Sequence, residues 1–244
     1  MRFMSMHKAT PDMERGAPPS AELLAGMGPL MEDMTKAGIF VTGEGLRESA
    51  HGVRLSFSGG RRTVTKGPLT GSNELIDRYL IVRAKSIDEA VEWASRFAGP
   101  DSEIDVRPVC EPWDLGFFPK PPNETTTRFM ILHKSDSKAE AGARPTPQRL
   151  AAMKKLADDL RVEGVLLSSE ALQPSSKGAR LRFRDGKRTV IDGPFTESKE
   201  LIAGFSIMQS VSRDEVIEWA SRFAHLIGDV EIDVRPLYEP SDLK

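Results

Sequence analysis

The feature that most constrains the fold of this chain is an internal repeat at a spacing of 126 residues. Between residues 2–98 and 128–224, about 44 of 97 aligned positions are identical without a gap, far more than chance produces. The stretch from Glu92 to Ala98 recurs unchanged at 218–224. The spacing then widens by two residues, and 103–108 recurs at 231–236. Each copy has the size of a domain and is too long to be one repeat of a solenoid.

Each copy contains the same series of expected elements, which is easiest to read in the second copy. They are a strand over 129–134, a helix opened by Thr146 and Pro147, a strand over 165–167, a hairpin over 179–191 with an Asp-Gly turn, a strand over 204–211, a helix with a capping box at Ser212, and a strand over 232–234. In the first copy, Gly26, Gly28 and Pro29 are expected to weaken or kink the first helix. Without the hairpin, the order is β-α-β-β-α-β, the split βαβ or ferredoxin-like pattern.

This order predicts an α+β protein with two ferredoxin-like domains and a hairpin extension on each. The expected boundaries are a first domain over 1–116, a proline-rich linker over 117–127 and a second domain over 128–244. The aromatic residues near the linker, Trp113 among them, suggest that it lies against a surface. Each sheet has helices on one face only, so its other face needs a cover, and the duplicate supplies one. We therefore expect an internal pseudo-dimer, with further pairing into a homodimer through the outer edges left open.

Composition excludes several classes of function. The formal net charge is -2, which gives no general attraction to nucleic acid or to a membrane surface. The single cysteine, Cys110, excludes an internal disulfide and suits a reducing compartment. Because no apolar run approaches about 18 residues and no signal peptide is evident, we expect a cytoplasmic protein. The spacing of His, Cys, Asp and Glu predicts no metal site, and no motif predicts a cofactor.

The stretch from Asp192 to Glu200, DGPFTESKE, is the first candidate site. Asp192 and Glu197 are candidate acids and Lys199 a candidate cation, because carboxylates in a partly dry cleft can have their pKa values pushed apart. The favoured alternative is a turn that ends the hairpin, with solvated charges beside it. In the first copy these three residues are replaced by Lys, Gly and Asn, so each chain has at most one intact site of this type.

Two matched pairs of residues are further candidates. His7 and His133 share a strand face with Phe3 and Phe129, which places them on the barrel side, either as a general base or as hydrogen-bonded core residues. Glu44 and Glu170 end the second strand of each copy. These carboxylates either join the histidines at a cavity mouth or, as we slightly favour, pair with Arg54 or Arg180 across the hairpin.

A basic row on the second hairpin is the last candidate; it consists of Arg180, Arg182, Arg184, Lys187 and Arg188. It can bind phosphates or an acidic partner, with Arg180 and Arg188 as the ligand contacts. A charge row on an exposed ribbon is more often a solvated edge that prevents aggregation. Aromatic residues are not interleaved with it, so nucleic-acid binding is not expected.

Together, the DGPF core at 192–195, the Glu-Trp-Ala helix at 218–220 and the strand at 231–236 resemble the DGPF branch of the YCII-related family. The resemblance covers nearly all of both copies and implies a dimeric α/β barrel. Some members of the family are joined to, or encoded with, extracytoplasmic-function sigma factors. Others carry a His-Asp pair suspected of catalysis, but Glu22 and Gln148 occupy the corresponding region here, so no such pair is carried over.

The expected function is therefore a small-ligand-binding or regulatory module, with a small molecule, a sigma factor or another protein as its partner. The alternative is a small-molecule enzyme that uses His133, Glu170 and Asp192 of the second copy. This alternative requires the three side chains to lie around one pocket, within hydrogen-bond reach of a shared substrate.

Overall fold

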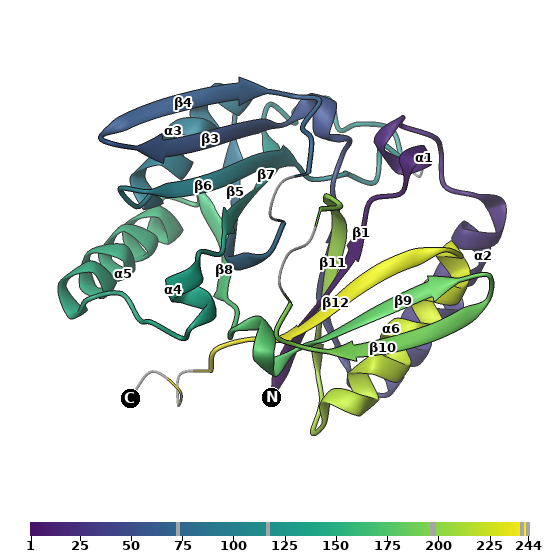
Figure 1. The fold of residues 1–244 in the computed structure, drawn as a ribbon. Helices are drawn as coiled ribbons and strands as arrows, with labels where there is room; N and C mark the ends of the chain where they lie inside the picture. Colours follow the sequence, from purple (N-terminus) through teal and green to yellow (C-terminus); the bar gives the residue numbers. More distant parts are fainter. Residues whose placement is uncertain (72–73, 116–117, 196–198, 240–241, 243–244) are drawn as a thin grey trace. The chain divides into compact units, whose positions relative to one another are not determined.

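The computed structural model describes residues 1–71, 74–115, 118–195, 199–239 and 242 (Figure 1). The chain forms two compact units. Unit 1 consists of residues 1–45 and 172–244, and unit 2 consists of residues 46–171. Each unit is an α+β fold built on a six-stranded antiparallel sheet.

Unit 1 contains a sheet with the strand order β10-β9-β12-β1-β11-β2. Its helices α2 and α6 pack against each other and cover one face of the sheet. The elements are β1 (Arg2–Lys8), α1 (Pro11–Glu14), α2 (Ala21–Lys36), β2 (Phe40–Gly45), η2 (Ser175–Lys177), β9 (Ala179–Arg184), β10 (Lys187–Asp192), β11 (Ile202–Gln209), α6 (Arg213–Ile227) and β12 (Val230–Pro236).

Unit 2 repeats this arrangement with the strand order β4-β3-β6-β7-β5-β8. Helices α3 and α5 bury their apolar sides against its sheet. The elements are η1 (Ser49–His51), β3 (Val53–Ser58), β4 (Arg61–Lys66), β5 (Ile76–Ala84), α3 (Ile87–Phe97), β6 (Ser102–Pro108), β7 (Thr127–Lys134), α4 (Ser137–Glu140), α5 (Pro147–Val162) and β8 (Leu166–Ala171).

Without the hairpin, the four remaining strands of each sheet, β12-β1-β11-β2 and β6-β7-β5-β8, have the ferredoxin-like order, and the hairpin extends the sheet beyond β12 or β6. The predicted fold class, two ferredoxin-like domains with a hairpin extension, is thus confirmed. Both predicted serine caps are present, since Ser86 accepts from the amide of Glu89 and Ser212 from the amide of Glu215, but the glutamate half of each capping box differs: Glu89 accepts from the amide of Lys85, and the amide of Ser212 donates to Ser210. Helix α2 spans Ala21–Lys36 through Pro29, held by Leu30 and Met34 in the core.

The compact units do not follow the two sequence copies. Strands β1 and β2 come from the first copy but complete the sheet formed by β9 to β12 of the second copy. In the same way, β7 and β8 of the second copy complete the sheet formed by β3 to β6. The predicted boundaries therefore describe the repeat along the chain, whereas each unit is assembled from parts of both copies.

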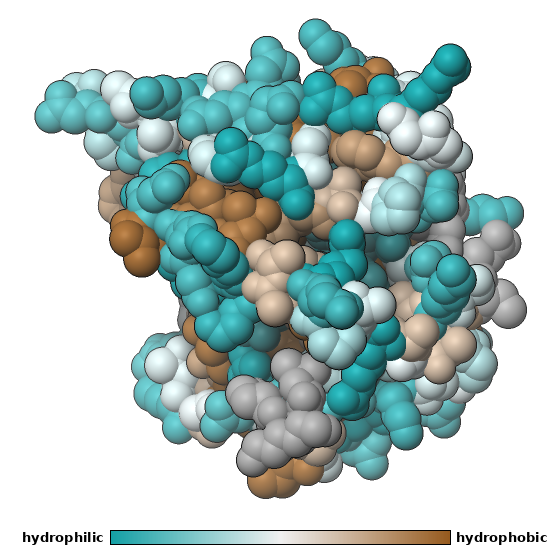
Figure 2. All heavy atoms as spheres, turned by 90° about the vertical axis from the view of Figure 1, so that its left-hand side faces the viewer, coloured by the Kyte–Doolittle hydropathy of each residue, from teal (hydrophilic) through white to brown (hydrophobic). Residues whose placement is uncertain are grey.

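The side of the molecule shown in Figure 2 is mainly hydrophilic, and its brown apolar areas are interrupted by charged and polar side chains. Helix α5 contributes the exposed apolar residues Leu150 and Val162. Within the part of the chain that the structure describes, no helix has the length and apolar composition needed to cross a bilayer.

Candidate functional site

The DGPF stretch has a backbone role, and both units show it. A Cβ added at Gly193 would lie 1.9 Å from the carbonyl oxygen of Ser175, so only glycine fits. Two residues on, the amide of Phe195 donates to the buried Ser175 hydroxyl at 3.0 Å. In unit 2, Gly67 and Ser49 repeat the same 1.9 Å approach. The favoured interpretation, a turn that ends the hairpin, agrees with these contacts.

The charged residues of this stretch do not form a cleft in the described part of the chain. Asp192 is exposed and forms an ion pair with Arg213 at 2.8 Å. Lys199 is exposed as well. Glu197 lies outside the described residues.

The basic row of the second hairpin divides into two structural roles. Arg180 is buried and donates to Asp233 through two bonds of 2.6 and 3.0 Å, while its guanidinium lies 4.5 Å from the ring centroid of Phe195. Arg188 lies on the outside and donates to Glu218 at 2.7 Å and Ser221 at 2.8 Å of α6. The interpretation of Arg180 as part of an exposed ribbon is therefore wrong, because it belongs to a buried ion cluster.

That ion cluster occurs in both units at matched positions. In unit 1, Lys8 lies 3.1 Å from Asp233, which also binds Arg180. In unit 2, Asp105 binds Arg54 at 2.7 and 2.8 Å and Lys134 at 3.0 Å, and Glu74 contacts both cations. Burial by itself raises the pKa of Asp233 and of Asp105, but the neighbouring cations outweigh burial and hold both pKa values below the usual range.

The two matched histidines face the helices and not a barrel interior, so the predicted orientation is wrong. The ring of His7 packs edge-on against Phe223 of α6, with 5.1 Å between the centroids. The expectation placed His7 on the face of Phe3, which is correct, but Phe3 belongs to the core beneath α2 and α6. Burial lowers the pKa of His7 to about 4.

The lowered pKa of His7 predicts that the free energy of unfolding depends on pH. Between pH 6.5 and about 4, the unfolded chain binds a proton at His7 that the folded chain excludes. Stability therefore falls as the pH falls through this window, by at most about 1.4 kcal/mol per pH unit. His7→Leu is expected to reduce this slope in urea unfolding, whereas His51→Gln, at an exposed histidine, leaves it unchanged. Equal slopes in all three proteins would contradict the assignment.

Glu170 and His133 lie on opposite faces of the sheet of unit 2. Glu170 of β8 is the cross-strand partner of Tyr79, and His133 of β7 is the partner of the next residue, Arg78. Because successive residues of a strand point to opposite faces, the carboxylate and the imidazole are separated by the sheet. Glu44 has the equivalent position in unit 1, opposite Phe205. Of the two arginines expected as partners, Arg54 binds Asp105, Glu74 and Glu103, and Arg180 binds Asp233 and Glu231.

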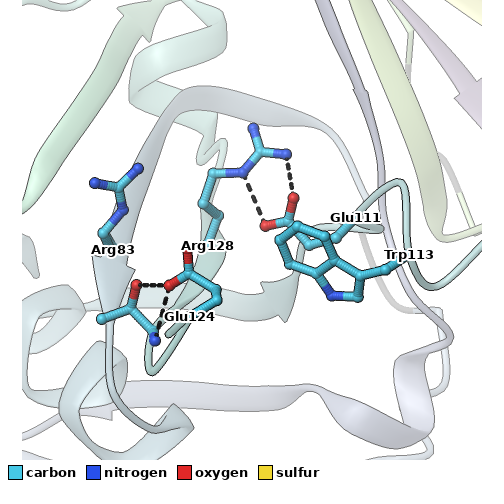
Figure 3. Close-up of a pocket in the computed structure, with 6 residues that line it drawn as sticks. Arg83, Glu111, Trp113, Glu124 and Arg128 are labelled. Atoms are coloured by element: carbon cyan, nitrogen blue, oxygen red, sulfur yellow. Dashed lines mark hydrogen bonds and ion pairs between the residues drawn. The ribbon is translucent and has the colours of Figure 1, made fainter. Parts of the chain in front are cut away.

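A pocket of about 140 Å³ lies in unit 2, where sequence reasoning placed no site (Figure 3). Its lining residues come from the end of β5, the start of β7 and the segment that joins β6 to β7; they are Arg83, Glu111, Trp113, Glu124, Thr126 and Arg128. Arg83 and Arg128 are direct cross-strand partners, which brings two guanidinium groups together.

The charges of this pocket are only partly paired. The carboxylate of Glu111, itself buried, accepts two bonds from Arg128, at 2.9 and 2.7 Å. Glu124 accepts from the amide and the hydroxyl of Thr126, and the hydroxyl bond is the main cause that lowers the pKa of Glu124. Within the described residues, the side chain of Arg83 makes no hydrogen bond or ion pair. In Figure 3 Arg83 lies on one side of Arg128, and the indole of Trp113 lies on the other.

Two sequence signals could have indicated this pocket. Trp113 was expected to lie against a surface. Arg83 corresponds to Gln209 in the second copy, so this cation is present in the first copy alone. The juxtaposition itself depends on the pairing of β5 with β7, which joins the two copies. Among the described residues, no group of three or more His, Cys, Asp or Glu side chains could hold a metal ion.

Comparison with known proteins agrees with this architecture. The model of the YCII-related domain matches the chain twice, over residues 1–111 and 127–226, as a tandem duplication requires. An uncharacterised protein of Rhizobium meliloti (strain 1021) is 35% identical over 75 residues, which cover 30% of this chain and 60% of that protein. The chain thus spans less than two thirds of this relative. Because the family model covers most of the sequence in two matches, the chain belongs to the YCII-related family.

Proposed function

We propose that this protein is a ligand-binding module that holds a small carboxylate in the pocket of unit 2. The observation that carries the proposal is the guanidinium of Arg83, which lines the pocket beside Arg128 and makes no hydrogen bond or ion pair with the described residues, although its charge helps to lower the pKa of Glu124. An arginine fork matches the two oxygens of a carboxylate and forms strong, charge-assisted hydrogen bonds with it.

The neighbouring charges limit the ligand to a single negative charge. Arg128 is already neutralised by Glu111 through two hydrogen bonds, so one guanidinium is available for a ligand. Glu124 adds a second carboxylate to the lining, which disfavours a dianion. The two arginines and two carboxylates of the lining cancel, so a monocarboxylate adds one negative charge where a dianion adds two, and the monocarboxylate is favoured.

The indole of Trp113 and the volume limit the rest of the ligand. A tryptophan supplies a flat apolar surface on which a ring or a short aliphatic group can stack. Cavities of about 150 Å³ accommodate a molecule as large as benzene, which is comparable to the 140 Å³ available here. Benzoate therefore fits both the charge and the size of the pocket.

Titration with benzoate tests this proposal, with binding measured by calorimetry and by tryptophan fluorescence. Arg83→Gln introduces the residue of the other copy, Gln209, and is expected to weaken benzoate binding at least tenfold, since a hydrogen bond to a charged group contributes about 1.5–3 kcal/mol. Trp113→Phe is expected to remove the fluorescence change while binding persists.

The matched controls separate a specific site from general charge attraction. Arg61→Gln removes an exposed arginine on β4 of the same unit and is expected to leave the affinity unchanged. Benzyl alcohol, which lacks the carboxylate, is expected not to bind. Equal benzoate affinity in the original protein and in Arg83→Gln would refute the proposal.

The other expected functions have less support. The enzyme alternative needs His133, Glu170 and Asp192 to converge, and the first two lie on opposite faces of one sheet. A sigma factor as partner stays a prediction from the family resemblance.

A further inference from the structure

His133 is a buried histidine with an unpaired ring nitrogen. Its side chain lies on β7 with 6% of its surface exposed, and within the described part of the chain its Nε2 atom has no hydrogen-bond partner. Buried polar atoms without a partner cost free energy, so their presence in a folded protein calls for an explanation. Its cross-strand neighbours are Arg78 on β5 and the apolar Ile104 on β6.

Two arginines surround this histidine. Arg78 is its direct partner across β5 and β7, and the Arg78 guanidinium donates to the sulfur of Met153 at 3.4 Å. Arg149, in the first turn of α5, donates to the carbonyl oxygens of Phe97 at 3.3 Å and Ala98 at 3.0 Å. Arg149 is exposed and lies at the start of α5.

These cations disfavour each other in the absence of an anion. Burial lowers the pKa of His133 well below its usual value, and the positive charges of Arg78 and then Arg149 lower it further. Burial also lowers the pKa of Arg78, where repulsion from Arg149 acts in the same direction and Asp77 opposes both. Positive groups that lie close together in a partly desolvated site repel each other, and this is unfavourable unless a negative charge compensates them.

Unit 1 shows that the histidine does not need these arginines for packing. The positions that correspond to Arg78 and Arg149 hold Gly204 and Leu23. There the ring of His7 lies directly over Gly204, since a Cβ at this glycine would be 2.5 Å from the ring carbon Cε1. The same histidine position is thus filled without any cation in unit 1, whereas unit 2 gathers two.

We propose that unit 2 binds a small oxyanion, of the size of phosphate, between Arg78, Arg149 and the imidazole of His133. The guanidinium groups approach it from the sheet and from the helix, and the imidazole of His133 donates from Nε2, which gives this atom the partner that it lacks. This site is independent of the carboxylate pocket, because it shares none of the residues that line that pocket.

Histidine NMR with inorganic phosphate tests the proposal, and His7 serves as an internal reference in the same molecule. Phosphate is expected to shift the ring resonances of His133 in a saturable manner and to raise its apparent pKa by one unit or more, while His7 does not respond. Sulfate is expected to act similarly, and chloride at equal ionic strength is expected to have no such effect.

Two variants replace the cations by the residues of unit 1. Arg78→Gly and Arg149→Leu are each expected to weaken the phosphate response at least tenfold, and Arg78→Gln serves if the glycine variant fails to fold. Arg83→Gln is expected to leave this response unchanged, so this experiment and the benzoate experiment can fail separately. An equal response of His133 and His7, or an unchanged response in Arg78→Gln, would overturn the proposal.

Discussion

Replacing Asp233 by asparagine is expected to lower the free energy of unfolding by about 3–5 kcal/mol, because the substitution leaves buried cations without their counter-ion. Asp233 lies at the centre of the unit 1 ion cluster, 2.6 Å from Arg180 and 3.1 Å from Lys8, and all three side chains are nearly inaccessible to solvent. Denaturation in urea at pH 7, compared between the variant and the original protein, measures the difference.

A matched control is available on the surface. Asp158 of α5 pairs with Lys154 one turn away, and both side chains are largely exposed, so Asp158→Asn is expected to change stability by no more than about 0.5 kcal/mol. Asp105→Asn, at the equivalent position of unit 2, is expected to behave like Asp233→Asn. If Asp233→Asn and Asp158→Asn cost the same, the buried cluster does not contribute to stability in the way argued here.

The buried ion clusters predict a second loss of stability in acid, at lower pH than the loss caused by His7. The pKa values of Asp233 and Asp105 are lower in the folded chain than in the unfolded chain. The folded state therefore binds fewer protons, and the contribution of these carboxylates is complete above the unfolded value of about 3.9 and is lost as the pH falls through the folded pKa. The loss of stability below pH 4 is expected to be smaller in Asp233→Asn.

Substitution of Gly193 by alanine is expected to destabilise the protein by about 3 kcal/mol or more. The added Cβ would lie 1.9 Å from the carbonyl oxygen of Ser175 and 2.6 Å from its carbonyl carbon, and both atoms belong to the backbone. Relief requires the turn to move away from η2, which also lengthens the hydrogen bond from Phe195 to Ser175. Thermal and urea unfolding measure the loss.

Gly28 provides the control for this substitution. It lies in α2, and a Cβ added there meets nothing within 4 Å. Gly28→Ala is therefore expected to leave stability unchanged or to raise it by up to about 1 kcal/mol, since alanine favours the helix. A Gly193→Ala variant as stable as Gly28→Ala would show that the turn tolerates a side chain.

The order of elements could be predicted because it depends on local patterns. Capping residues, turn residues and apolar alternation are properties of short stretches, and Ser86, Ser212 and the Asp185-Gly186 turn lie where these patterns place them. The exchange of strands between the copies could not be predicted. Strands β1 and β7 have nearly the same sequence, so no local pattern indicates which of them β11 pairs with.

The sites could be predicted less well because they depend on which face of a strand is covered. Alternation correctly grouped His7 with Phe3, but it does not say which of the two faces lies beneath the helices. The pocket beside Arg83 depends on a pairing between strands that come from different copies. The ion cluster combines Lys8 with Asp233, which are separated by almost the whole chain.

The division of the chain has a consequence for its synthesis on the ribosome. Unit 2 is one uninterrupted segment, so all of its strands are available once residue 171 has emerged. Strand β1 is made first, yet its partners β11 and β12 are among the last elements to appear. Synthesis proceeds at about 5–20 residues per second, so the apolar side chains of β1 stay without these partner strands for on the order of 10 s or more. The nascent chain must therefore keep its first strand from pairing elsewhere, most directly with the equivalent positions of the unit that folds before it.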